Sequence, residues 1–219
     1  MEDLNLANLV ESLSANGYPL CSILKERIEK FLYNFLDETV TDVDTRLKIR
    51  KDFGFCCAHA WMLQKNENCL GQGIIYQDLV ETFHRNFIFP ADPRKTRKCL
   101  DSLVASRKCL ICDHAARIEK RYLEVFSDSF DKPELKEAYS KSQGLCLDHM
   151  VAAVRGWRSS KTITSYLETE SARLKELDAE LKEFIRKFDY RYAGEKFGRE
   201  KDSWIRAIEK ISGRRGNYY

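Results

Sequence analysis

Apolar residues recur at intervals of three and four along most of this chain, the spacing that gathers them on one face of an α-helix. The first such stretch covers residues 3–15 and stops at Asn16-Gly17, a pair typical of a helix end. A second follows Pro19 and keeps the period until the polar stretch of residues 37–44. The pattern therefore predicts two amphipathic helices in this part of the chain.

The same spacing predicts three more helices before the middle of the chain. A short charged helix leads to Gly54, and the next one carries Trp61. A longer helix is expected over residues 74–87, before Pro90 and Pro93 interrupt the pattern.

After Arg94 the pattern begins again and predicts a helical hairpin. One helix opens at Cys109 and Cys112, the residues around Pro133 turn the chain, and a shorter helix returns it to Gly144. We expect two antiparallel helices of similar length here, because this path would bring both ends of the hairpin together. A further helix carries Cys146 and His149 in its first turns.

Beyond Trp157 the apolar residues become seven apart, with charged residues between them. The residues at this spacing are Leu167, Leu174, Leu181 and Phe188, and Leu177 and Phe184 occupy the interleaved positions. Such a seam is typical of a long helix that packs on another helix. We expect its partner to be the final helix, through Trp204, Ile205, Ile208 and Ile211.

These elements predict an all-α fold in three parts. Residues 1–93 and 94–158 would form two pseudo-repeated helical hairpins clipped by Cys/His metal motifs, and residues 159–219 a long C-terminal helical hairpin on the same core. The 219 residues, 43% of them hydrophobic, are enough to bury an ordinary core. The net charge of +3 gives only weak support for a polyanionic partner.

Three thiols and an imidazole make the strongest chemical signal. Cys109 and Cys112 form a C-x2-C pair, and Cys146 and His149 form a C-x2-H pair one helical turn long. Together they are a complete ligand shell for one tetrahedral ion, for which zinc is the first choice and a 4Fe–4S cluster the alternative. Unligated core cysteines would be the plain alternative. A closed site of four ligands is usually structural.

An internal repeat indicates a second, incomplete site. Gly54-Phe-Cys56-x2-His59 matches Gly144-Leu-Cys146-x2-His149, and Tyr18-Pro-Leu-Cys21 matches the Cys109 motif with a one-residue slip. The first half thus keeps Cys21, Cys56 and His59 but has Tyr18 in place of a cysteine. These three residues could have lost their ion, could use Cys57 or another local ligand, or could form an open catalytic metal or thiol centre.

Other candidates are weaker. Cys69, Cys99 and His84 are expected to be structural or incidental, and His114 is a minor alternative to His149 as a ligand. A basic stretch before the metal loop could meet phosphates of a nucleic acid, although a charge run is more often a solvated face. It comprises Arg94, Lys95, Arg97, Lys98, Arg107 and Lys108.

The motif set resembles an uncharacterised family of archaea and anaerobic bacteria. Its pattern contains C-P-x-C, G-F-C-x2-H, a second C-x2-C and G-x-C-x2-H, followed by D-Y-R and S-W-x-x-A segments. Here the last two are Asp189-Tyr-Arg191 and Ser203-Trp204-x2-Ala207, and the pattern departs at Tyr18. The resemblance implies metal ligation but no reaction. An anaerobic setting would make an iron–sulfur cluster easier to sustain.

The sequence favours a metal-binding accessory or interaction protein over an enzyme. Self-association or a protein partner is expected at the C-terminal helices. The acidic N-terminus has no signal-peptide pattern and no apolar run is long enough to span a membrane. We therefore expect a cytoplasmic protein, with reduced thiols.

Overall fold

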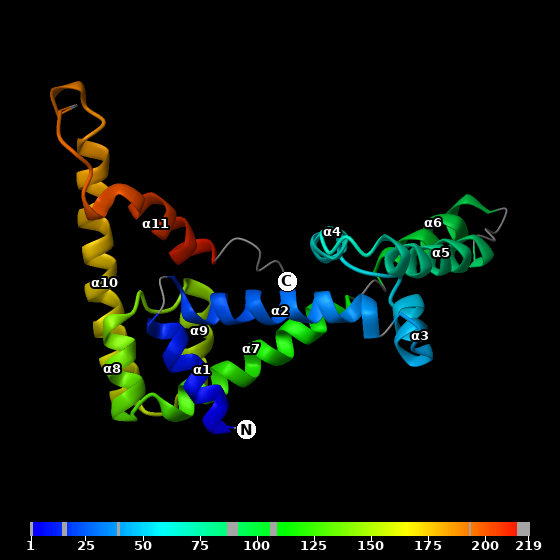
Figure 1. Ribbon diagram of the computed structural model, residues 1–219, viewed down its shortest axis with the longest axis horizontal. Coiled ribbons are helices and arrows are strands. Elements are labelled where there is room, and N and C mark those ends of the chain that lie inside the picture. Colours follow the sequence, from blue (N-terminus) through cyan, green and yellow to red (C-terminus); the bar gives the residue numbers. More distant parts are fainter. Residues whose placement is uncertain are drawn as a thin grey trace. The chain divides into compact units, whose positions relative to one another are not determined.

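The computed structural model describes residues 2–14, 17–38, 40–86, 92–105, 109–192 and 194–213. All regular secondary structure in these ranges is helical, which confirms the predicted all-α fold (Figure 1). None of these helices combines the length and the unbroken apolar sequence that a bilayer span requires.

The chain divides into two compact units. The terminal unit comprises Met1–Lys25 and Glu119–Asn217, and the middle unit comprises Glu26–Ile118 with the last two residues. The boundary falls inside α2 (Pro19–Glu38) and inside α7 (Leu110–Ser129), so each of these helices belongs partly to both units. This division differs from the expected parts that end at residues 93 and 158.

In its described residues, the middle unit contains four shorter helices besides its shares of α2 and α7. They are α3 (Val43–Lys51), α4 (Cys57–Gln64), α5 (Cys69–Asn86) and α6 (Pro93–Ala105). Helix α5 begins five residues before the expected start at Ile74, and its expected last residue, Phe87, lies outside the described ranges. Helix α3 begins where the carboxylate of Asp42 accepts a hydrogen bond from the Thr45 amide at 2.8 Å.

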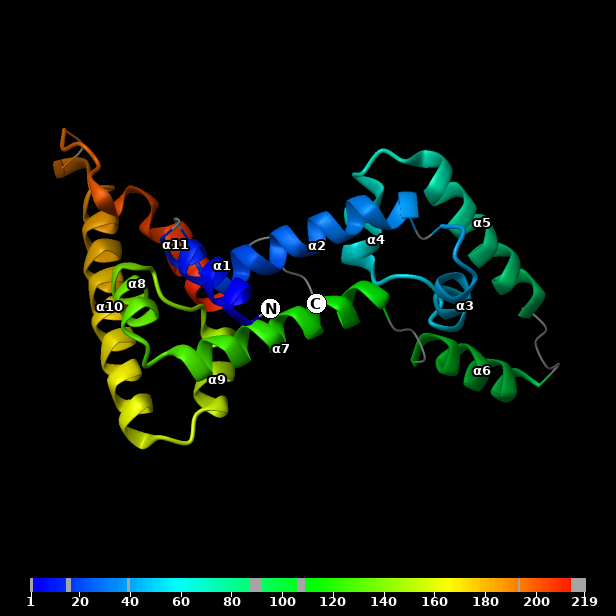
Figure 2. The ribbon, with the colours of Figure 1, turned by 60° about the horizontal axis from the view of Figure 1, so that its bottom comes forward.

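The terminal unit is built from α1 (Glu2–Ser14), α8 (Pro133–Lys141), α9 (Leu147–Gly156), α10 (Ser160–Arg186) and α11 (Ser203–Ser212), with two short 3-10 turns, Tyr190–Tyr192 and Arg199–Asp202. Helix α1 packs on α8, and α11 packs on α9 and α10 (Figure 2). A cluster of aromatic rings joins α7, α8 and α10 and includes Phe126, Phe130, Tyr139, Trp157 and Tyr166.

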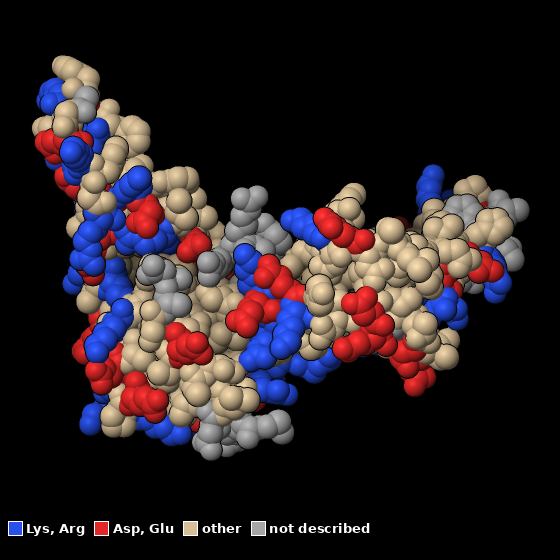
Figure 3. All heavy atoms as spheres, in the orientation of Figure 1, with Lys and Arg blue, Asp and Glu red and all other residues tan. Residues whose placement is uncertain are grey.

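Helix α10 is the long helix that the heptad-like spacing predicts. Lys, Arg, Asp and Glu side chains are intermixed along the face of it seen in Figure 3. Because opposite charges alternate there, this face offers no block of one sign to a polyanion.

The packing face of α11 differs from the expected one. Trp204, Ile205, Ile208 and Ile211 keep 43–59% of their surface exposed, whereas Ser203 and Lys210 are buried. Lys210 lies against α10, where its ammonium pairs with the buried carboxylate of Glu170. Helix α11 therefore packs on α10 as expected, but a buried ion pair lies at this contact and the four apolar residues keep about half of their surface exposed.

Candidate metal centres

The structure brings seven of the cysteine and histidine side chains into two groups. The middle group contains Cys56, His59, Cys109 and Cys112, and the terminal group contains Cys21, Cys146 and His149. Within each group the candidate ligand atoms all lie within 4.8 Å of one another. These are the seven residues that the sequence proposes as ligands.

The grouping differs from the one inferred from sequence. Cys109 and Cys112 join Cys56 and His59, while Cys146 and His149 join Cys21. The reason is the length of the hairpin helices: α7 has 20 residues and α8 only 9, so α7 rises about 30 Å and α8 returns only about 14 Å. The proposed open centre of Cys21, Cys56 and His59 is likewise divided between the two groups.

Both C-x2-H motifs have the same local structure. Gly54 and Gly144 precede them with φ of 90° and 80°, values that side chains other than glycine rarely adopt. Cys56 and Cys146 then stand immediately before α4 and α9 in extended conformation. The histidine three residues later lies in the first helical turn, so that its imidazole faces the cysteine sulfur.

The other ligands come from the starts of α7 and α2. Cys109 immediately precedes α7, and Cys112 lies in its first turn. Tyr18 immediately precedes α2 in the same way, and Cys21 lies in its first turn. The terminal group therefore has a tyrosine at the place where the middle group has a cysteine.

The middle group has the spacing of four ligands around one ion. The His59 Nδ1 atom lies 3.2 Å, 3.5 Å and 3.3 Å from the sulfurs of Cys56, Cys109 and Cys112, and the Cys56 and Cys112 sulfurs are 3.8 Å apart. Zinc bonds of about 2.3 Å to sulfur and 2.0–2.1 Å to nitrogen put two sulfurs about 3.8 Å apart and sulfur and nitrogen about 3.5 Å apart in a tetrahedron. The donor set therefore fits zinc.

The terminal group forms a similar triangle. The Cys21 sulfur lies 3.5 Å from both the Cys146 sulfur and His149 Nδ1, and Cys146 Sγ lies 3.1 Å from the same nitrogen. All three side chains are almost completely buried. On the other side of the ring, Glu119 Oε1 lies 3.4 Å from His149 Nε2. A carboxylate in this place is the usual second partner of a metal-binding histidine.

Tyr18 does not offer its oxygen to the terminal group. Its ring is buried against Cys21 and Cys146, but its hydroxyl donates a hydrogen bond to the Arg206 carbonyl at 3.1 Å. Burial, together with nearby carboxylates, raises the pKa of this phenol. Tyr18 is therefore a neutral residue that packs against the group and does not act as a ligand. This leaves three protein ligands.

The three thiols of the middle group differ in their pKa values. Burial raises the pKa of Cys109, but hydrogen bonds from His59 and from backbone amides outweigh it and lower the pKa to about 6. Burial and the Cys109 thiolate instead raise the pKa of Cys112, and burial raises that of Cys56. One thiolate thus forms readily, and a cation would have to displace protons from the others.

The terminal group favours a thiolate beside an imidazolium. Hydrogen bonds from Cys21 and His149 outweigh burial and lower the pKa of Cys146 to about 4. Burial lowers the pKa of His149, but the Cys146 thiolate and Glu119 raise it overall, to about 9. A buried thiolate is thus favoured beside an imidazolium, with the Glu119 carboxylate on the other side of the ring.

The remaining sequence candidates lie outside both groups. Cys57, Cys69 and His84 are exposed, and the side chain of Cys99 lies outside the described residues. His114 stacks on Phe31 with ring centroids 4.0 Å apart, and burial lowers its pKa. Of the basic stretch, Arg94, Lys95, Arg97 and Lys98 are exposed on α6, and Arg107 and Lys108 lie outside the described residues.

Sequence reasoning missed the partners of the ligands. Glu119 lies seven residues after Cys112 on α7 and belongs to an Arg-Ile-Glu-Lys segment that occurs twice in the chain, at residues 27–30 and 117–120. That repeat marks Glu119 but does not reveal its contact. Lys210 and Glu170, which meet beside the Leu145 carbonyl, had no signal because each looks like an ordinary helix-surface charge.

The fold and these groups define an all-α protein with Cys/His sets that could hold metal ions. The chain belongs to DUF6062, a family of unknown function whose sequence pattern matches residues 4–217. A relative from Caldicellulosiruptor sp. (strain Rt8B.4), named "Uncharacterized 23.9 kDa protein in xynA 3'region", is 25% identical over 207 residues, 94% of this chain and 99% of the relative. No solved structure matches the chain.

Proposed function

We propose that this protein binds two zinc ions, one in each compact unit, and that the ions stabilise the fold. The observation that carries the proposal is the convergence of ligands from distant parts of the chain on two compact groups. In the middle unit, Cys56 and His59 would be tied to Cys109 and Cys112. In a reducing compartment such as the cytoplasm, these thiols would remain available as ligands.

The two ions would differ in their coordination. The middle group supplies three thiolates and an imidazole, a complete set that is typical of structural zinc. The terminal group supplies two thiolates and one imidazole, so a fourth ligand would come from a water molecule or another small donor. No more than 2% of the surface of each of these three ligand residues is exposed. A structural role is therefore favoured over catalysis at this site as well.

The spacing of the ligand atoms supports zinc over a 4Fe–4S cluster. A cluster of this kind takes each protein ligand on a different iron atom and therefore holds thiolates farther apart than one ion does. The sulfur to sulfur distances of 3.5 Å and 3.8 Å suit a single ion. The iron–sulfur reading thus becomes the second candidate.

Metal removal tests the structural role. Thermal unfolding would be followed by far-ultraviolet circular dichroism before and after treatment with a strong chelator under reducing conditions. Since metal binding contributes directly to folding, we expect a large fall in the midpoint, restored by adding zinc. An unchanged midpoint after complete zinc removal would contradict the proposal.

We further propose that α11 mediates association with another protein chain. Trp204, Ile205, Ile208 and Ile211 are exposed together on this one helix, and contiguous apolar surface of this kind is typical of an interaction site. Self-association is the form of this proposal that can be tested on the purified protein alone.

Light scattering coupled to size-exclusion chromatography measures that association directly. The wild type should increase in molar mass with concentration, and Ile208→Asp should remain monomeric because a charge replaces an exposed apolar contact. Ile185→Asp is a matched control, since Ile185 is also exposed but lies on α10. A wild type that is monomeric at all concentrations would contradict self-association.

A further inference from the structure

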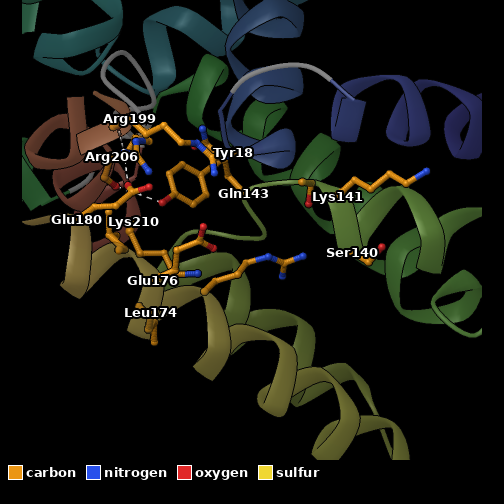
Figure 4. A pocket seen from close by; sticks show the side chains of 13 residues that line it. Tyr18, Ser140, Lys141, Gln143, Leu174, Glu176, Glu180, Arg199, Arg206 and Lys210 are labelled. Atoms are coloured by element: carbon orange, nitrogen blue, oxygen red, sulfur yellow. Dashed lines mark hydrogen bonds and ion pairs between the residues drawn. The ribbon is translucent and has the colours of Figure 1, made fainter. Parts of the chain in front are cut away.

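The terminal unit contains a cavity of about 280 Å³ that the metal ligands do not line (Figure 4). Its wall is formed by the start of α2, the end of α8 with the connection to α9, the middle of α10, the Arg199–Asp202 turn and α11. Tyr18 forms one side of it and separates it from the terminal group. The cavity is therefore a distinct place, one side chain away from a candidate metal centre.

Cations outnumber carboxylates among the side chains that line this cavity. Five basic residues face two acidic ones, Glu176 and Glu180: they are Lys141, Arg173, Arg199, Arg206 and Lys210. Lys210 and Arg173 both pair with Glu170, which lies behind the wall and carries a single charge. Glu170 can thus neutralise only one of the two positive charges of Lys210 and Arg173.

The arginines are held in place by bonds that leave part of each guanidinium unused. Arg173 donates from Nη1 to Glu170 and from Nη2 to the Tyr139 carbonyl. Arg206 donates from Nε to Asp202 and from Nη2 to Glu180, and no described residue accepts from its Nη1. A guanidinium fixed in this way can offer its remaining N–H groups to a ligand at a small entropic cost.

Two further groups in the wall lack partners. Arg199 has no carboxylate partner among the described residues, although it lines the cavity. The Gln143 Oε1 atom is buried and has no hydrogen-bond donor in the described structure. A rotation of the side chain exchanges the oxygen and nitrogen of this amide, so Gln143 can turn its NH2 group, a hydrogen-bond donor, toward an anion in the cavity.

We propose that this cavity binds a small oxyanion, the carboxylate or phosphate group of a small molecule. Oxygen atoms of either group accept paired hydrogen bonds from a guanidinium, and Arg199 is the residue free to supply them. The Tyr18 hydroxyl already donates to the Arg206 carbonyl, so Tyr18 lines the cavity without donating a hydrogen bond to the ligand. The site stands independently of the zinc proposal, because it uses no metal ligand.

Isothermal titration calorimetry with inorganic phosphate and, separately, with succinate tests the site on the full chain at constant ionic strength. Binding of phosphate alone or of succinate alone identifies the preferred group. Arg199→Ala should weaken binding about tenfold or more, since it removes a charged hydrogen-bond donor. Arg158→Ala should leave it unchanged, because Arg158 is an exposed cation that does not line the cavity.

The variant Glu176→Gln tests the sign of the ligand's charge. Removal of a carboxylate from the wall should strengthen the binding of an anion, since it removes a like charge. Weaker binding in this variant would mean that the site takes a cation or a zwitterion and would overturn the proposal. No heat with either probe at millimolar concentration, or equal affinities for wild type and Arg199→Ala, would overturn it as well.

Discussion

Glu119 and His149 form a contact between α7 and α9 in which the carboxylate lies 3.4 Å from Nε2 of the imidazole. The opposite ring nitrogen faces the sulfurs of Cys21 and Cys146. Glu119 therefore lies where its carboxylate can hold the imidazole with Nδ1 toward the two thiols.

Replacing Glu119 should loosen the terminal ion without removing a ligand. Glu119→Gln should lower zinc affinity about 10-fold to 100-fold, the usual cost of losing a partner of a metal-binding histidine. The measurement is the rate at which a chromophoric chelator takes up zinc. Glu124→Gln, one turn and a residue further on α7 and exposed, is the control. Equal rates for both variants would mean that Glu119 has no role at the site.

Tyr18→Cys should create a fourth ligand in the terminal group. Cys109 precedes α7 as Tyr18 precedes α2, so a cysteine at position 18 would complete a set like that of the middle group. We expect zinc to be held about tenfold more tightly or better, as measured by chelator competition. Tyr18→Ser loses the same ring without gaining a thiolate and should hold zinc no more tightly than the wild type. Equal retention in the two variants would argue against the equivalence.

The grouping of ligands can be tested by combining two substitutions. Cys112→Ser and Cys146→Ser should each lose one zinc ion, and the double variant should lose both, because the two cysteines belong to different groups. Metal content by emission spectrometry gives the answer directly. If the cysteines shared one ion, the double variant would lose no more zinc than either single variant.

The buried pair of Glu170 and Lys210 should be strongly coupled. Glu170→Gln leaves the ammonium of Lys210 in a buried place without a counter-charge, so we expect about 3–5 kcal/mol of destabilisation. Lys210→Met should relieve part of this loss in the double variant. Urea unfolding of the four proteins measures the coupling, and strictly additive losses would refute it.

Asp78 on α5 should make the middle unit sensitive to acid. Burial opposes its ionisation, but hydrogen bonds from Arg50 and Arg46 on α3 outweigh burial and hold the pKa of Asp78 below its ordinary value. The stability that ionised Asp78 contributes to the folded state is therefore complete above about pH 4. It is lost as the pH falls through the lowered pKa of Asp78.

Asp78→Asn should cost about 1–3 kcal/mol near neutral pH and progressively less in acid. Urea unfolding as a function of pH provides the measurement. Asp178→Asn removes an exposed helix-surface pair and should cost under about 1 kcal/mol. A loss for Asp78→Asn that does not shrink in acid would show that the ion pairs are not its source.

The sequence predicted the helices well because their apolar spacing is a local property. It also proposed the seven side chains that the structure gathers into two groups. Six of them stand in C-x2-C or C-x2-H spacings, which place side chains on one helical turn, and Cys21 follows from the internal repeat. It could not pair the motifs correctly, because the pairing depends on how far α8 returns along α7. Because α8 is eleven residues shorter than α7, Cys146 and His149 do not return to the start of α7, and His149 lies beside Glu119 instead.

The face of α11 shows the same limit. Apolar residues normally mark the buried side of a helix, so the sequence predicts that Trp204, Ile205, Ile208 and Ile211 face α10. The structure buries Lys210 instead, because Glu170 on α10 provides a counter-charge that sequence spacing cannot reveal. The hydrophobic pattern of the sequence therefore could not predict charged contacts between distant helices.

Metal analysis with a visible absorption spectrum tests the central claim most directly. The protein would be purified without oxygen and without added metal, and zinc and iron would be measured per chain. We predict two zinc ions, no iron and no visible absorption, because each group holds its ligands at the spacing of one ion. Absence of bound metal, or about four irons per chain with a broad brown absorption, would contradict the account.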